Sequence, residues 1–132
     1  MEQSLVFIKP DGVERGLVGD VLKRFEQRQI KIKKLELKQL EPSQVDAHYI
    51  EHLDKPFYPN LKEYILSGPI VLMVLEAENV ISIIRKMVGA TNSAEAAPGT
   101  IRGDFALNTS NNIIHASDSP ESAAREIANF FQ

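Results

Sequence analysis

The chain has 132 residues, of which 43% are hydrophobic and 25% are charged, as in ordinary soluble globular proteins. This length predicts a single domain over residues 1–132. The absence of cysteine excludes disulfides and thiolate metal sites. A net charge of −3 argues against a general nucleic-acid binder, so an anionic substrate would need a local cluster of cations.

The N-terminus and the apolar runs bear on location. MEQSLVFIKPDG has an acidic second residue and a short apolar run, unlike a signal peptide. No apolar run approaches the roughly 20 residues that cross a bilayer. We therefore expect a cytoplasmic protein without a membrane partner.

The first half of the chain shows strand and helix patterns in turn. Residues 4–9 (SLVFIK) have the composition of a buried strand, which the turn signal KPDG ends. Apolar residues recur at helical spacing over residues 17 to about 29. Residues 30–40 alternate for much of their length, which predicts a half-exposed strand. Two short helices are expected within 42–67.

The second half begins with the most apolar run, at 70–76, which predicts a central strand. A helix with one apolar face follows over 79–88. Residues 89–105 have no periodicity and predict a long loop, a feature that is usually functional or disordered. A strand at 112–115 and a last helix with Ser119 as its N-cap complete the order.

This order of elements predicts the fold class. Strands and helices alternate as β, α, β, a pair of helices, β, α, a long loop, β and α. Repeated β-α-β units of this kind favour an α+β, ferredoxin-like βαββαβ sandwich. In that fold we expect a four-stranded antiparallel sheet with helices packed on one face.

His115 stands between the last expected strand and a well-capped helix. Imidazole is mostly neutral and nucleophilic near neutral pH, because its pKa is about 6.5. It could take a phosphoryl group on one ring nitrogen if an acceptor fixed the proton on the other. Glu126 and Asp118 are the candidate acceptors. The alternative is that His115 only caps a strand and Glu126 is solvated, and this segment does not decide between them.

Several other side chains could serve an anionic substrate. Lys9 and Arg102 lie at a strand end and in the expected loop, where polar groups can converge, and Arg85 lies on a helix. The planar guanidinium suits phosphate, and Thr91 could add a hydroxyl. Each cation alone is more often a plain surface charge. Phe57, flanked by prolines, could stack on a base, although core packing is the commoner use of a phenylalanine.

Some site classes are missing from the sequence. There is no G-x-x-x-x-G-K-[ST] P-loop and no G-x-G-x-x-G dinucleotide fingerprint. The nearest metal-ligand pattern is HYIEH, with His48 and His52, and it lacks a clear third ligand. We therefore expect no metal site built from protein ligands alone.

Four longer motifs follow one another along essentially the whole chain: FIKPDGVERGLVG, HYIEHLDKPFYPNLKEYILSGPIV, GATNSAEAAPGTIRGDF and NNIIHASDS. On these motifs the chain resembles the nucleoside diphosphate kinase family, whose N-x-x-H-x-S-D active-site signature matches the last one. The resemblance implies reversible ping-pong transfer of the γ-phosphoryl group from a nucleoside triphosphate to a nucleoside diphosphate. A phosphohistidine on His115 would be the intermediate, and the activity would maintain NTP and dNTP pools.

The resemblance also implies nucleotide-binding residues. The ribose hydroxyls would be bound by Lys9 and Asn112, with Lys9 also near the transferring phosphoryl group. The base would stack on Phe57. The phosphates would be held by Arg85, Thr91 and Arg102.

Supporting residues follow from the same resemblance. Tyr49 and His52 would line the pocket, and Thr109 would face Phe57 across the base. Glu126 would orient the imidazole. The remaining supporting positions are Ser117, which would hold that arrangement, and the nearby Asp118.

The family further implies a cofactor and an assembly. Mg²⁺ would be carried by the nucleotide phosphates, and the chain would form a homo-oligomer, a tetramer or a hexamer built from dimers. Ser93 stands where many members have proline, and the sequence ends before the C-terminal extension of longer relatives, so the number of subunits stays open. The alternative function is a non-catalytic nucleotide or RNA-binding module of similar fold. The acidic charge and the missing aromatic RNA-binding consensus speak against it.

Overall fold

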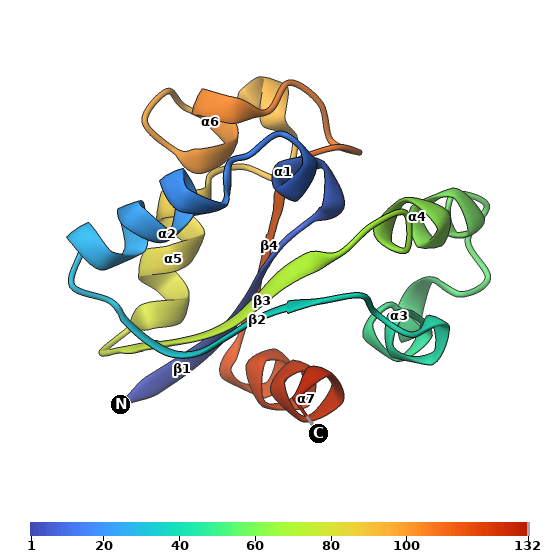
Figure 1. Cartoon of the computed structure of the whole chain (residues 1–132), viewed down its shortest axis with the longest axis horizontal. Coiled ribbons are helices and arrows are strands. Elements are labelled where there is room, and N and C mark those ends of the chain that lie inside the picture. Colours follow the sequence, from blue (N-terminus) through green and yellow to red (C-terminus); the bar gives the residue numbers. More distant parts are fainter. Residues whose placement is uncertain (132) are drawn as a thin grey trace.

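The computed structural model describes residues 1–131, and its centre is one four-stranded sheet (Figure 1). The strand order is β2-β3-β1-β4, and every neighbouring pair is antiparallel. The strands are β1 (Glu2–Ile8), β2 (Lys31–Lys38), β3 (Ile70–Ala77) and β4 (Ile114–Ala116). The predicted α+β class and ferredoxin-like sheet are therefore confirmed.

The register of the sheet puts the predicted site next to the largely buried strand β1. β1 pairs with β3 along its whole length, from Glu2 opposite Ala77 to Ile8 opposite Val71. On its other side, β1 pairs with β4, where Phe7 lies opposite His115. His115 is thus in the middle of a three-residue strand that pairs with the buried part of β1, residues 4–8.

Helices cover both faces of the sheet, not one as expected (Figure 1). The first face packs against α2 (Val18–Gln27), α5 (Val80–Val88) and α6 (Ile101–Phe105). The second packs against α3 (Pro42–His48), α4 (Tyr58–Ile65) and α7 (Pro120–Phe130).

Composition explains the second helical layer. Along β1, Val6 and Ile8 join the first core, whereas Leu5 and Phe7 join the second. Residues 5–8 of β1 therefore have no polar side chains that alternate with the apolar ones and face water. A strand that is apolar on both faces has to be covered on both.

Two segments differ from the sequence prediction, and both are short helices. The turn signal after β1 forms α1 (Pro10–Glu14), with proline in its first turn. The expected loop at 89–105 contains a 3₁₀ turn, η2 (Ser93–Glu95), and then α6, whose N-cap Thr100 accepts a hydrogen bond from the Gly103 amide at 3.0 Å. A second 3₁₀ turn, η1 (Ile50–His52), links α3 to α4. Within residues 1–131, no helix has the length and apolar character needed to span a membrane.

Candidate active site

His115 and Glu126 are paired. Nε2 of His115 lies 3.1 Å from Oε1 of Glu126, which comes from α7 and is buried. The hydroxyl of Ser117 donates to the same carboxylate oxygen at 2.7 Å. A carboxylate can only accept, so this contact favours the tautomer with the proton on Nε2 and leaves the Nδ1 lone pair free. The ring also stacks on Phe7, with centroids 4.9 Å apart.

The pairing decides between the two candidate acceptors. Asp118 is exposed, and its carboxyl pKa is lowered first by a hydrogen bond from the Ser122 side chain. The carboxylate that lies within hydrogen-bond distance of the imidazole is that of Glu126. Of the two acceptors considered from the sequence, the structure therefore selects Glu126.

A strained turn sets the entry into β4. Ile113 has φ = 74°, which a β-branched residue rarely adopts, and the Ile114 amide donates to the Asn112 carbonyl at 2.8 Å. This is a classic γ-turn, a rare and strained conformation. The Lys9 amide holds the Ile113 carbonyl at 2.6 Å. Gly12 leaves room for the turn, because a Cβ there would lie 2.9 Å from the Ile113 side chain.

Lys9 is a buried cation within hydrogen-bond reach of Asn112. Its Nζ donates to Oδ1 of Asn112 at 2.6 Å, and Nδ2 of Asn112 donates to the Thr91 carbonyl at 3.2 Å. The pKa of Lys9 is lowered to about 8, first by burial and then by Arg102, while Asp11 opposes the shift. The charged ammonium is therefore held in a place where it lacks water and would gain from an anionic ligand.

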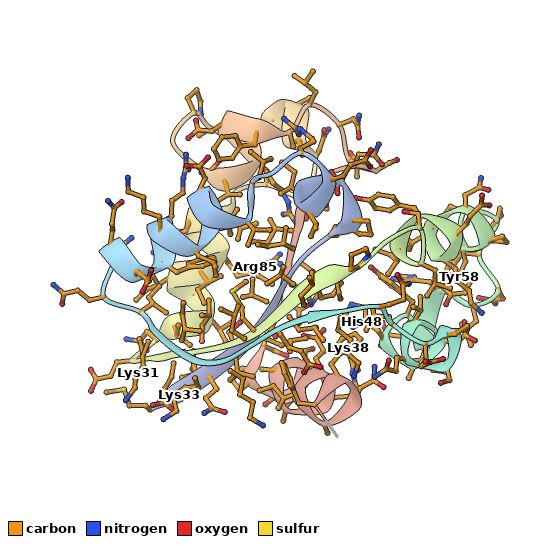
Figure 2. All side chains as sticks on the ribbon, in the orientation of Figure 1. Lys31, Lys33, Lys38, His48, Tyr58 and Arg85 are labelled. Atoms are coloured by element: carbon orange, nitrogen blue, oxygen red, sulfur yellow. The ribbon has the colours of Figure 1, made fainter. Side chains whose placement is uncertain are left out.

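Two arginines flank β4 from different elements. The buried Arg102 of α6 donates to the Ile114 carbonyl at 2.7 Å and to the Gly89 carbonyl at 3.1 Å, and its Nε is buried without a partner. Burial, and then Arg85, lower its pKa to about 10. Arg85, an exposed residue of α5 (Figure 2), donates to the Ala116 carbonyl at 3.1 Å. The two guanidinium groups thus bracket the backbone that carries His115.

A cavity of about 700 Å³ gathers most of the predicted nucleotide-binding side chains. This volume is within the usual range for small-molecule sites. Phe57, which is 51% exposed, offers a free ring face at its rim. The other predicted residues that line the cavity are Lys9, Tyr49, His52, Thr91, Thr109 and Asn112.

A neighbouring hollow of about 660 Å³ shares Thr91 with this cavity. Arg85 and Asp118 line it as well. His115, Arg102, Ser117 and Glu126 line neither hollow, although hydrogen bonds tie Arg102 to β4 and Glu126 to the imidazole.

Sequence reasoning missed several lining residues and one buried histidine. Asn60, Leu61, Tyr64, Ser110 and Asn111 also line the larger cavity. Helical spacing from Phe57 could have indicated the first two, because Asn60 and Leu61 follow it by three and four residues. His48 lies close to His115 and Glu126, with one ligand atom of each within 4.8 Å of the others. The sequence noted His48 only in HYIEH, and no local pattern links it to residues so far along the chain.

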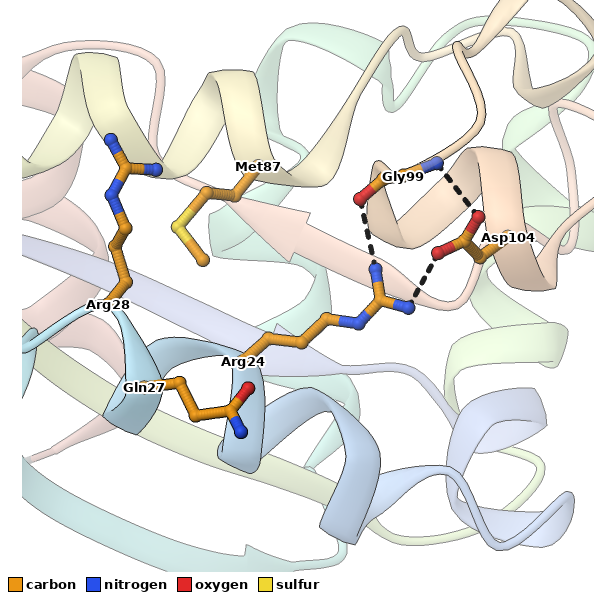
Figure 3. A pocket seen from close by; sticks show the side chains of 6 residues that line it. All are labelled: Arg24, Gln27, Arg28, Met87, Gly99 and Asp104. Atoms are coloured by element: carbon orange, nitrogen blue, oxygen red, sulfur yellow. Dashed lines mark hydrogen bonds and ion pairs between the residues drawn. The ribbon is translucent and has the colours of Figure 1, made fainter.

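Arg24 of α2 holds both α6 and the segment before it. Arg24 of α2 pairs with Asp104 at 2.6 Å and donates to the Gly99 carbonyl at 3.2 Å (Figure 3). Asp104 in turn accepts from the Gly99 amide at 2.9 Å. These bonds hold α6, and with it Arg102, against α2 across a smaller crevice that also contains Arg28.

Comparisons with known proteins identify the family of this chain. The profile of the family described as nucleoside diphosphate kinase matches residues 2–132. The nucleoside diphosphate kinase of Methanocorpusculum labreanum is 60% identical over 99% of this chain and 88% of its own length. That of Archaeoglobus fulgidus is 53% identical over 99% and 87%.

Solved structures give the same result. The halophilic nucleoside diphosphate kinase from Halobacterium salinarum, in complex with CDP, has a TM-score of 0.96 and 41% identity, over 99% of this chain and 88% of that one. A nucleoside diphosphate kinase family protein from Babesia bovis has a TM-score of 0.97 and 45% identity, over 100% and 89%. The chain therefore belongs to the nucleoside diphosphate kinase family and is a phosphotransferase that acts on nucleotides.

Proposed function

We propose that this chain transfers the γ-phosphoryl group between nucleotides in two steps, with His115 as the carrier. The observation that supports this role most directly is the 3.1 Å contact from Nε2 to Glu126, which leaves Nδ1 free to attack. In the first step, a bond forms between Nδ1 and the γ-phosphorus while the bond to the bridging oxygen breaks, releasing a nucleoside diphosphate. In the second step, a terminal oxygen of another diphosphate attacks the phosphorus and the N–P bond breaks.

The proton on Nε2 stays in place throughout these steps. A phosphorylated imidazole that keeps this proton carries positive charge on the ring, and the buried carboxylate of Glu126 stabilises it. Because the carboxylate accepts from both Ser117 and His115, it is positioned before the reaction. Such preorganised charge is the main source of catalysis in phosphoryl transfer.

The remaining residues bind the nucleotide. We assign the phosphates to Arg85, Arg102 and Thr91, since Thr91 joins the two hollows and the guanidiniums flank β4. Lys9 and Asn112 would bind the ribose hydroxyls as a hydrogen-bonded pair. The base would enter the cavity rim against Phe57, with Thr109 on the other side and Tyr49 and His52 lining the wall.

A divalent metal ion is required by this family. The one cluster of three possible ligands among residues 1–131 consists of two imidazoles and one carboxylate, His48, His115 and Glu126. Mg²⁺ prefers oxygen ligands and keeps several waters, so this cluster does not fit it. We propose that Mg²⁺ is bound through the phosphates of the nucleotide. The protein's own contribution to neutralising the phosphates is the set of cations around β4.

Labelling with ATP tests the carrier role of His115. We expect the wild-type protein to acquire an acid-labile, alkali-stable phosphate from the γ position of ATP, as a phosphohistidine does. His115→Ala should lose both the label and the activity, because no other imidazole is bonded to Glu126 through Nε2 in the described chain. His52→Ala, which removes a pocket histidine, is the matched control and should keep the label. A label that survives in His115→Ala would refute the assignment.

The second prediction is a broad range of bases. The ring face of Phe57 is available to any base and is worth about 1–3 kcal/mol. Asn60 and Asn111 add amides to the rim, but both are exposed, so water can satisfy them when a base does not. Because an amide carries both donors and an acceptor, it rejects no base outright. Strong selection needs buried polar groups that the wrong base leaves unpaired.

Measurement of kcat/KM over a nucleotide set tests this prediction. ATP, GTP, CTP, UTP and their 2′-deoxy forms should all be substrates. A nucleotide without the 3′-hydroxyl should be markedly poorer, because Lys9 and Asn112 would lose their ligand. Overwhelming preference for one base, or indifference to the 3′-hydroxyl, would contradict the proposed pocket.

We also propose that the chain forms a homo-oligomer built from dimers, either a tetramer or a hexamer, because β2 lies at an edge of the sheet. The assignment of residues 1–132 to one kinase domain and the cytoplasmic location remain predictions. Limited proteolysis and fractionation of cells would test them.

A further inference from the structure

His48 is a buried imidazole that the proposed reaction leaves without a role. It is the last residue of α3 (Figure 2), and its side chain is only 4% exposed. The ring packs edge-on against His115, with centroids 4.6 Å apart and planes at 88°. It also contacts Phe7 at 5.6 Å and Phe130 at 5.3 Å between centroids. A polar ring in such an apolar setting requires an explanation.

The two oxygens of the Glu126 carboxylate differ in their hydrogen bonding. Both hydrogen bonds found for it within residues 1–131, from His115 and Ser117, end on Oε1. Oε2 faces Nδ1 of His48 at 3.7 Å. That Nδ1 is buried and has no hydrogen-bond partner among the described residues. The unpaired nitrogen and the second carboxylate oxygen therefore face each other.

Charge decides which form of His48 is present. Burial holds the pKa of His48 far below the ordinary value, and electrostatic interactions with His115, Arg125, Lys9 and His52, in that order, disfavour its protonated form further. The ring is therefore neutral near pH 7 and carries one proton, on either Nδ1 or Nε2. Opposite a carboxylate, the proton on Nδ1 is the favoured choice, because a lone pair there would repel Oε2.

We propose that His48 is a positioning residue that acts through Glu126: its Nδ1–H donates to Oε2, so that the carboxylate is held at both oxygens and kept turned toward His115. This role rests on the proposed carrier function of His115. At 3.7 Å the contact is longer than a hydrogen bond, and such contacts in unliganded sites tighten when the substrate complex forms. A neutral donor suits this place, since a charged His48 would compete with His115 for the same carboxylate.

The first test needs no variant. Long-range proton–nitrogen correlation NMR on the resting wild-type protein distinguishes the two tautomers of each histidine. We expect His48 to be neutral with its proton on Nδ1, and His115 to carry its proton on Nε2. A His48 that is charged, or that carries its proton on Nε2, overturns the proposal. Because this measurement involves no phosphoryl transfer, it stands even if the carrier role of His115 fails the labelling experiment.

A pair of variants provides the second test. His48→Leu removes the donor, and His48→Asn keeps an amide N–H close to the position of Nδ1. In His48→Leu we expect single-turnover phosphorylation of His115 by ATP to slow by about tenfold to a hundredfold, as when a reacting group is misplaced. The KM for ATP should not change, and the Nε2–H tautomer of His115 should lose its predominance. His48→Asn should recover most of the rate and the tautomer. Wild-type behaviour of His48→Leu, or an equal loss in His48→Asn, overturns the proposal.

Discussion

At the scale of single residues, the lowered pKa of Lys9 makes the free energy of unfolding depend on pH. The residue is 8% exposed, and burial, with Arg102 as the second cause, lowers its pKa from 10.5 to about 8. A cation with a lowered pKa releases its proton more readily in the folded chain than in the unfolded chain. Between about pH 8 and 10.5 the unfolded chain thus binds more protons, so the contribution of Lys9 to the free energy of unfolding rises with pH. The cost of burying the charge is fully present below pH 8.

Comparison with Lys9→Met isolates this contribution. From pH 7 to pH 10, the free energy of unfolding of the wild-type protein should rise by about 2 kcal/mol relative to the variant. Urea denaturation at several pH values measures both proteins under the same conditions. Lys23→Met, at an exposed position on α2, is the control and should show no such difference. If the free energies of unfolding of the wild type and of Lys9→Met change in parallel with pH, the pKa of Lys9 is not lowered by folding.

At the scale of elements, the 3₁₀ turn η2 between α5 and α6 contains a residue, Ser93, that lowers the stability of the fold. Ser93 begins η2, is 4% exposed, and has a buried hydroxyl without a partner. Its backbone N–H makes no hydrogen bond within residues 1–131. Asn92 before it is extended, with ψ = 104°. Proline suits the first position of a helical turn, and an extended residue suits the position before it.

Ser93→Pro should therefore stabilise the fold. It removes a buried unsatisfied hydroxyl and restricts the unfolded chain, which together are worth about 1 kcal/mol. The midpoint of urea denaturation should rise. Ser93→Ala removes the hydroxyl alone, so the gap between the two variants measures the backbone effect. If Ser93→Pro is no more stable than Ser93→Ala, the backbone of η2 does not accept proline as described.

At the scale of the whole molecule, the sequence predicts most elements but misses the shortest helices. Hydrophobic patterning indicates β1, β2, β3, α2 and α5, whereas β4 follows from a short apolar run and α7 from its N-cap Ser119. The five-residue helices α1 and α6 are too short to show a period. Tertiary bonds such as Arg24–Asp104 hold α6 in place, and no local pattern reveals such bonds. The second helical layer was implied by the two-faced β1 but was not deduced from it.

The site shows the same division. Motifs indicated His115, Lys9 and Arg102, and the fold brings them around β4. The segment alone left Glu126 and Asp118 open as acceptors, and the family resemblance implied Glu126. The contact itself depends on the geometry of α7. His48 is far from His115 along the chain, and only the packing of α3 against the second face brings them together.

The unprotected edge of the sheet leads to the last prediction, on assembly. Within residues 1–131, β2 pairs with β3 on one side only, and its other side is an open edge of eight residues. Leu35 and Leu37 on this strand are 51% and 66% exposed. An open edge with exposed leucines invites pairing with another chain. β4, at the other edge, is only three residues long and offers far less backbone.

We therefore expect β2 to form the dimer contact from which the homo-oligomer is built. In light scattering, the wild-type protein should have a mass several times 14.8 kDa, and the double variant Leu35→Glu, Leu37→Glu should fall to smaller species. Carboxylates at both positions would weaken the dimer. They would repel each other across the contact, or they would lose water against apolar surface. Ile50→Glu, at a 55% exposed position on η1, is the control for added surface charge and should keep the wild-type mass. A wild-type monomer would refute the oligomer itself, whereas an unchanged mass in the double variant would place the contact on a surface other than β2.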